Sequence, residues 1–358
     1  MQPADLIAIL HSRTGLHVER VKAVLRALVI GPSDKSLLPF IPRPIKLLVA
    51  FVFLLNWRSW PLVWHAKVFM PTLRVRLNAF FKARSLQNKR KFLGEISCVG
   101  ADPFEVVSTI KRYASVDDIG GYHLSNSVYF KVCDFSRGKA FLDLFPAVLG
   151  DGAWIAVGAT NCTYIHEISP GAYYDVKTTI GGWDEKWLYI VYHFITYPSK
   201  SSKSSKPSST NKPLYKAPGT IPKSKIKSPL PEGAVLNCVI TSACCFKFGR
   251  ITVPPQVALI ACGFGDPSKR RWFHVQELRY SKNYPPASTK PPVIKNKMQD
   301  IMRGGWKTAH VEDWPTNPHT GVNTFWELGE YEERRAHNVK EIFGPVHSGM
   351  KHLREKGY

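Results

Sequence analysis

One long helical pattern, followed only by strand-like runs, is the feature that most restricts what this chain can fold into. Residues 126–145 place apolar side chains at helical spacing over a broad surface, and Pro146 follows directly. Strand-like runs come once before this helix and four times after it, at 109–115, 154–168, 173–180, 187–197 and 235–245. Strands and helices therefore do not alternate as they do in a parallel sheet. We predict an α+β fold in which an antiparallel β-sheet wraps around one long central helix.

The chain divides by composition into three parts and one insertion. Residues 199–231 are rich in Ser, Lys and Pro and cannot bury enough apolar surface to fold, so we predict a disordered insertion. The α+β domain then covers 101–265 around this insertion, between a helical segment at 1–100 and a C-terminal extension at 266–358. Two smaller elements are expected, a hairpin-like turn and a charged helix, at 181–186 and 326–342.

The N-terminal segment has the pattern of a membrane-associated region. Residues 16–29 are expected to form an amphipathic helix, and no cleavable signal peptide is evident. Residues 44–64 contain an uninterrupted apolar run of nine residues at 47–55, whereas a spanning helix needs about 20. An interfacial aromatic belt is indicated by three tryptophans there, Trp57, Trp60 and Trp64. We predict an interfacial or re-entrant anchor, with a transmembrane helix or an ordinary core helix as the alternatives.

Positive charge is concentrated outside the predicted α+β domain. The net charge is +22, but residues 1–100 carry 16 Lys/Arg against 4 Asp/Glu, and 198–230 carry 8 Lys and no acid. Residues 101–197 have 7 basic and 11 acidic side chains. A nucleic-acid-binding domain places its basic residues on the folded surface. The distribution therefore argues against nucleic acid and favours an anionic membrane surface as a partner.

Cysteine usage indicates a reducing compartment. The chain has seven cysteines, no Cys-x-x-Cys pair, and most of them in apolar strand-like stretches. Buried free thiols are typical of that pattern, so we expect an intracellular protein with no metal site and no cofactor. The sequence also lacks a Gly-x-Ser-x-Gly motif, which disfavours a serine nucleophile. Phosphate-loop and dinucleotide motifs are likewise absent.

The stretch most suggestive of chemistry leads directly into the long helix. It reads Asp117-Asp118-Ile-Gly-Gly-Tyr-His123-Leu-Ser-Asn126-Ser-Val-Tyr129. A second motif, Phe246-Lys-Phe-Gly-Arg-Ile-Thr-Val-Pro-Pro255, follows the last predicted strand. Together these motifs resemble the hot-dog-fold thioesterase superfamily, in the 4-hydroxybenzoyl-CoA-thioesterase-like branch that includes thioesterase superfamily member 6 and its fungal relatives. The resemblance covers about residues 109–262, and an apolar segment before the fold is also typical of that branch.

The resemblance implies a hot-dog fold with a site at the start of its central helix. Thioester hydrolysis needs a nucleophile or general base and a group that stabilises an oxyanion. The helix N-terminus offers unpaired backbone N–H groups to the thioester carbonyl. The expected catalytic residues are Asp118, His123 and Asn126. The expected substrate contacts are Gly121, Ser127 and Tyr129, with Lys247 and Arg250 for the phosphates of coenzyme A.

Each assignment has a structural alternative. Asp118 stands five positions before His123, where the family pattern has four. Asp117 is therefore the alternative catalytic residue, or neither Asp is catalytic and the domain only binds its ligand. Alternatively, His123 shapes the loop, Asn126 caps the helix and Tyr129 packs in the core. Lys247 and Arg250 would then simply end a strand in solvent.

The resemblance implies hydrolysis of an acyl-CoA or acyl-carrier-protein thioester by a homodimer, with the site between paired subunits. A non-enzymatic, membrane-associated acyl-binding or scaffold protein of the same fold is the first alternative. A nucleic-acid-binding protein, whose affinity would fall steeply with salt, is the second. Release of free thiol from acyl-CoAs separates the first two hypotheses.

Overall fold

The computed structural model describes residues 40–83, 85–197, 233–280, 297–307, 314–315, 324–341 and 343–344. The chain divides into two compact units, Met1–Trp64 and His65–Tyr358, and each is described by itself. The helix expected at 16–29 and the insertion expected at 199–231 lie outside the described residues.

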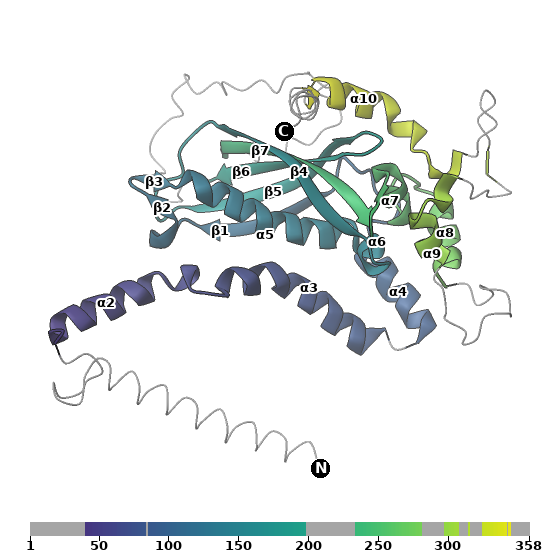
Figure 1. The fold of residues 1–358 in the computed structure, drawn as a ribbon. Coiled ribbons are helices and arrows are strands. Elements are labelled where there is room, and N and C mark those ends of the chain that lie inside the picture. Colours follow the sequence, from purple (N-terminus) through teal and green to yellow (C-terminus); the bar gives the residue numbers. More distant parts are fainter. Residues whose placement is uncertain are drawn as a thin grey trace, which may run out of the picture. The chain divides into compact units, whose positions relative to one another are not determined.

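The second unit is built on one antiparallel sheet with a long helix along its inner face (Figure 1). The strand order is β1-β5-β6-β7-β4, and β8 pairs with the end of β7. The strands are β1 (Val107–Tyr113), β4 (Trp154–Tyr164), β5 (Tyr173–Trp183), β6 (Leu188–Thr196), β7 (Val235–Phe248) and β8 (Ile251–Val253). The helix is α5 (Asn126–Leu144), and the hairpin of β2 (Ile119–Gly120) and β3 (His123–Leu124) stands just before it. The predicted antiparallel sheet around one long helix is confirmed, and the arrangement is hot-dog-like.

The periodicities of helix and strand explain why this core forms. Nine residues of α5 are buried, at spacings that place most of them on the side facing the sheet. Alternate residues of the central strand β6 meet them, since Ile190, Tyr192 and Phe194 are all 0% exposed. The hydroxyls of Ser136 on α5 and Thr178 on β5 share a hydrogen bond of 2.6 Å. That bond satisfies two polar groups that would otherwise be buried without a partner.

The prediction of a turn at 181–186 is wrong for residues 181–183. Gly181–Trp183 continue β5, and the turn begins at Asp184, whose carboxylate accepts two backbone hydrogen bonds of 2.7 and 2.6 Å. Gly181 is needed for packing and not for turning, because a Cβ there would lie 2.3 Å from Cζ of Phe343. The strand expected at 154–168 likewise stops earlier, at Tyr164.

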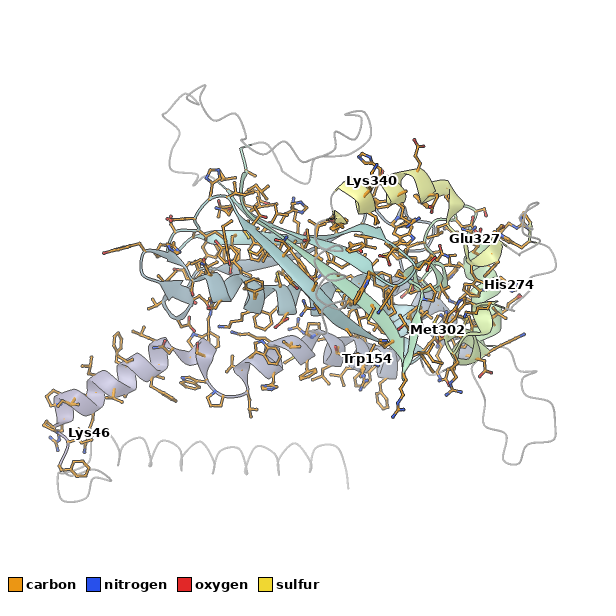
Figure 2. The ribbon with its side chains drawn as sticks, turned by 45° about the horizontal axis from the view of Figure 1, so that its top comes forward. Lys46, Trp154, His274, Met302, Glu327 and Lys340 are labelled. Carbon is orange, nitrogen blue, oxygen red and sulfur yellow. The ribbon has the colours of Figure 1, made fainter. Side chains whose placement is uncertain are left out.

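The outer face of the sheet, opposite α5, is covered by α10 (Glu332–Glu341), which carries the labelled Lys340 (Figures 1 and 2). Just beyond this helix, the ring of Phe343 stacks on Tyr189 with a centroid distance of 4.6 Å. The charged helix expected at 326–342 is thus present but begins later. Two short turns precede it, η4 (Thr324–Trp326) and η5 (Gly329–Tyr331).

Short helices after α5 gather at the end of the sheet where α5 stops (Figure 1). They are α6 (Pro146–Gly150), α7 (Pro255–Ala261), α8 (Arg270–Tyr280) and α9 (Lys297–Met302). Arg279 of α8 donates from Nε and Nη2 to the carboxylate of Asp151, at 2.9 and 2.7 Å, and both side chains are almost fully buried. The hydrophobic core therefore continues past residue 265, and the domain boundary there stays a prediction.

The N-terminal helices bury no residue completely. In the first unit α2 (Arg43–Leu55) and the short turn η1 (Trp57–Ser59) have no buried side chain. The same holds for α3 (Val63–Lys82), whose residues from His65 onward belong to the second unit, and for α4 (Leu86–Ile96) in that unit. Among the described residues no helix combines the length and apolar character needed to cross a membrane.

Candidate active site at the start of the central helix

Asp118 lies in the loop that leads into α5, and its side chain is only 10% exposed. Its backbone carbonyl accepts a hydrogen bond of 3.0 Å from the N–H of Ser125, directly before the helix. Its carboxylate oxygens accept from the Ser115 hydroxyl at 3.0 Å and from Nζ of Lys131 at 3.1 Å. The carboxylate is therefore fixed beside the first turns of α5, with partners from the loop and from the helix.

The neighbouring Asp117 shares one of these partners. The Ser115 hydroxyl lies 2.5 Å from Oδ1 of Asp117 and 3.0 Å from Oδ2 of Asp118. A hydroxyl carries a single hydrogen, so the two carboxylates compete for it or share it. Asp118 is buried whereas Asp117 is half-buried. Burial and the contact with α5 support Asp118 as the carboxylate of the site.

Lys131 is the site residue that sequence reasoning missed. It stands on α5, 13 positions after Asp118, and its side chain is 29% exposed. Only the folding of the loop against the helix brings the two together. The sequence did contain one sign of this partner. A buried carboxylate needs a cation or several hydrogen-bond donors, and Lys131 is a cation within an otherwise apolar turn of the helix.

A tight hairpin accommodates the extra residue between Asp118 and His123. Strands β2 and β3 pair so that Gly121 and Tyr122 form a two-residue turn. Gly121 has φ of +81°, and a positive φ at the first central position is what a type II′ turn requires. Gly121 thus shapes the turn, and Tyr122 at its tip is 93% exposed.

His123 is half-buried on β3, with its ring fixed by a local hydrogen bond. Nδ1 lies 2.9 Å from the carbonyl oxygen of Leu124, which can only accept, so Nδ1 carries the hydrogen. In the neutral ring Nε2 then keeps a lone pair and can accept a proton or a hydrogen bond. This tautomer is compatible with a role as a proton acceptor.

The first turn of α5 presents polar groups to solvent. Asn126 and Ser127 are exposed, and the hydroxyl of Ser127 lies 3.1 Å from that of Ser125. Ser125 occupies the N-cap position, so the alternative in which Asn126 caps the helix is wrong. The first backbone N–H groups of a helix lack intrahelical acceptors and form the positive end of its dipole. This end of α5 can therefore stabilise a carbonyl oxygen that gains negative charge.

Tyr129 lies in the core and not on the surface of the site. It is 3% exposed and packs against Phe194 and Tyr164, with centroid distances of 4.9 and 5.2 Å. Burial raises the pKa of its phenol above the ordinary range, so the group stays neutral. Its position supports the structural alternative. The more exposed Tyr164 lies nearer the helix start, with its hydroxyl 3.5 Å from the carbonyl of Asn126.

Within one subunit, Lys247 and Arg250 are not brought together with Asp118. Lys247 is paired across the sheet with Trp154, at the far end of β4, and its Nζ donates to the Thr252 hydroxyl at 2.5 Å. Arg250 lies in the exposed turn between β7 and β8. The whole length of α5, 19 residues or about 28 Å, separates this end from the start of the helix. Figure 2 shows the labelled Trp154 at the end of the sheet away from the β2–β3 hairpin.

Two cysteines of the core are held in the thiol form by burial. All seven are free. Burial raises the pKa of Cys262 to about 12, as it does for Cys244, so neither is a nucleophile at neutral pH. Among the residues that the structure describes, no three His, Cys, Asp or Glu side chains gather as a metal site requires.

Comparison with known proteins places the site segment in a family. Residues 116–206 match the profile described as Thioesterase-like superfamily. Thioesterase poxG of Penicillium oxalicum is 28% identical over 229 residues, which cover 59% of this chain and 68% of that protein. Protein THEM6 of Danio rerio is 33% identical over 76 residues, 21% of this chain and 38% of that protein.

A solved structure, that of BH1999 gentisyl-coenzyme A thioesterase, covers 42% of this chain and 98% of its own, at 9% identity and a TM-score of 0.27. So low a score adds no weight to the assignment. The family assignment rests on the sequence matches and on the observed sheet around α5. The domain that contains residues 116–206 belongs to the thioesterase-like superfamily.

Proposed function

We propose that the protein hydrolyses an acyl thioester, of coenzyme A or of an acyl-carrier protein, at the start of α5. One observation carries the proposal. The buried carboxylate of Asp118 is fixed beside the N-terminal turns of the central helix, within the segment that matches the thioesterase-like profile. The sequence relatives of this chain include proteins named as thioesterases.

The geometry supplies the parts that this reaction needs. The thioester carbonyl oxygen binds at the first N–H groups of α5, which stabilise the oxyanion as it forms. The Asp118 carboxylate takes a proton from a water molecule that attacks the carbonyl carbon, or it attacks that carbon itself to form an acyl–Asp118 anhydride that water then cleaves to the free acid. The C–S bond then breaks, and the sulfur leaves as a thiolate that is reprotonated. His123, with its free Nε2 lone pair, orients the water or the substrate.

A homodimer would complete the site. In the described part of the chain β4 is the last strand of the sheet, and its exposed side chains include Trp154, Val157 and Tyr164. An unpaired strand edge is a template for pairing with another chain. Antiparallel pairing of β4 with its copy would bring the Trp154 end of one subunit to the Tyr164 end of the other.

That pairing gives Lys247 and Arg250 a role they cannot have within one subunit. They stand at the Trp154 end of the sheet, so in the dimer they approach the start of α5 in the opposite subunit. Cations at that place would bind the phosphates of coenzyme A. Ser127 and Asn126, exposed on the first turn, would contact the part of the substrate nearest the thioester.

The proposed setting is intracellular and membrane-associated. Large apolar residues of α2 are exposed, among them Leu48 at 60% and Phe53 at 56%. A helix that is apolar on every side is stable when lipid or protein covers it. The full chain should therefore sediment with membranes after lysis and be released by detergent. Recovery in the soluble fraction without detergent contradicts the membrane setting and leaves the hydrolase proposal intact.

Release of free thiol from a panel of acyl-CoAs of different chain lengths tests the activity. Turnover of at least one substrate by the purified full chain, above the rate without protein, is the expected result. Failure across acyl-CoA and acyl-carrier-protein substrates contradicts hydrolysis.

A non-enzymatic acyl-binding function is the second candidate, and a specific observation favours it. Both carboxylate oxygens of Asp118 already have partners, Ser115 and Lys131, as they would if the residue only held the loop to the helix. Acyl-CoA binding without thiol release would identify this function.

A further inference from the structure

The two faces of α3 have opposite surroundings within the second unit. One face is half-buried and carries small or branched side chains, Val68, Thr72, Val75 and Ala79. The carbonyl oxygen of Val68 lies 3.9 Å from the position a Cβ would take at Gly138, on the side of α5 away from the sheet. Both views place α3 along α5 (Figures 1 and 2). The half-buried face of α3 is thus the one with its small or branched side chains, and at Val68 its backbone approaches α5.

The other face of α3 carries its largest apolar side chains, and they are exposed. Phe80 is 70% exposed, Phe81 64% and Phe69 60%, and Met70, Leu73 and Leu77 are between 41% and 49%. At about 100° per residue these six positions fall within one sector of the helix. A helix on a soluble protein normally turns such residues inward and its polar residues outward. An exposed apolar face of this size marks a surface that binds something.

The charges around this face identify what binds. From Phe40 to Gly94 the sequence contains no Asp or Glu. On α3 itself the charged residues are Lys67, Arg74, Arg76 and Lys82, and Arg74 and Arg76 border the apolar sector on its two sides. A helix with aromatic and leucine side chains on one face and basic residues beside them is suited to the surface of an anionic bilayer. A second copy of this chain is disfavoured, because two such faces would bring like charges together.

We propose that the outward face of α3, formed by Phe69, Met70, Leu73, Leu77, Phe80 and Phe81, binds the surface of an anionic lipid bilayer. The helix lies in the plane of the interface, with its arginines among the headgroups and its rings among the upper acyl chains. This contact rests on the membrane association proposed above and assigns it to one helix, α3. The catalytic unit itself, and not only the segment before it, then touches the lipid.

Photo-crosslinking in the full chain tests this contact at the helix itself. Phe80 on the outward face and Asn78, which is exposed but outside the apolar sector, are replaced one at a time by p-benzoylphenylalanine. The probes are vesicles of phosphatidylcholine alone and of phosphatidylcholine with phosphatidylserine. Crosslinks from position 80 to lipid, stronger with phosphatidylserine and absent or much weaker from position 78, are the expected result. Crosslinks from position 80 to another copy, or to this chain's own residues, overturn the proposal.

A matched pair of charge substitutions gives a second measurement. Leu77→Glu and Asn78→Glu add the same charge at adjacent positions, about 100° apart on the helix. Leu77→Glu should lower the partition onto phosphatidylserine vesicles by about tenfold or more, because besides adding the charge it removes an exposed apolar side chain that the bilayer would cover. Asn78→Glu should lower it by less than about fivefold, the effect of one charge at the surface. Equal effects overturn the proposal.

These measurements separate this inference from the proposed reaction. Thiol release from soluble acyl-CoA by the Leu77→Glu variant should equal that of the unaltered chain, since Leu77 does not belong to the site. A chain that binds vesicles through α3 and releases no thiol contradicts the hydrolase alone. A chain that releases thiol but gives no lipid crosslink contradicts the α3 contact alone.

Discussion

Nζ of Lys131 lies 3.1 Å from Oδ1 of Asp118 and joins the second turn of α5 to the loop before it. The carboxylate is 10% exposed and the ammonium group's side chain 29% exposed, so the pair is shielded from water on the carboxylate side. Such a pair can hold the carboxylate for catalysis and can also stabilise the loop against α5. Substitutions of Asp118 and of Lys131 distinguish these two roles.

Replacing Asp118 by Asn should lower turnover of an acyl-CoA by about 10²-fold or more, the usual effect of losing acid–base catalysis. The amide keeps the size of the side chain but can neither attack nor act as a base. The Michaelis constant should change little, because the substrate contacts remain. Steady-state kinetics with Asp117→Asn as the control measures this. A large loss in Asp117→Asn with a silent Asp118→Asn assigns the chemistry to the neighbouring carboxylate.

Lys131→Met should lower the free energy of unfolding by about 1–2 kcal/mol, less than a fully buried pair would lose because Lys131 is partly exposed. The substitution leaves the Asp118 carboxylate without its cation. Chemical denaturation measures the change, and Lys131→Arg should restore most of it. In the Asp118→Asn background Lys131→Met should cost clearly less, since no charge is stranded. The same cost in both backgrounds rules out the pair as the cause.

Arg279→Met should cost about 3–5 kcal/mol of unfolding free energy, because it strands the Asp151 carboxylate in the core. The side chains of this pair are 4% and 2% exposed. Arg303→Met is the matched control, since that arginine is 54% exposed and lies 3.8 Å from Asp300. The control should cost less than about 1 kcal/mol. Similar losses in the two variants would show that the Arg279 pair does not join α8 to the core.

Gly181→Ala should destabilise the fold by about 1–3 kcal/mol through overpacking. The added methyl would lie 2.3 Å from Cζ of Phe343, and also close to Val191. Gly150→Ala, where nothing lies within 4 Å of the added methyl, is the control. Thermal unfolding of both variants measures the difference. A Gly181→Ala chain as stable as the control would show that Phe343 does not cover this strand.

Stability should fall as the pH drops from about 6.5 towards 4, in part because of His193. Burial lowers the pKa of this ring in the folded chain to about 4, from 6.5. Between these values the unfolded chain binds a proton that the folded chain does not, so the unfolded state is favoured as pH falls. The contribution is at most about 3 kcal/mol. Denaturation curves of the unaltered chain and of His193→Gln at both pH values isolate it. Parallel pH dependences would contradict the assignment.

The local pattern of the sequence determined the long helix and the order of the five long strands around it. Apolar spacing predicted the helix at 126–145 within one residue of α5, and period-two alternation predicted the strands of the sheet. These patterns follow from the geometry of each element, which a short window of sequence contains. The Asp–His–Asn–Tyr order, through its resemblance to hot-dog thioesterases, predicted a site at the start of the helix, and that assignment stays a prediction.

Only the tertiary structure decided which side chains meet. The partner of Asp118 is 13 residues away on a helix face, and Arg279 reaches Asp151 across 128 residues. Lys247 lies the length of α5 away from Asp118. That separation depends on the register between β4 and β7, which the apolar pattern of a single strand does not specify. Such contacts form because burying a charge without a partner costs free energy. Which partner lies near enough depends on how segments that are distant in the sequence pack together.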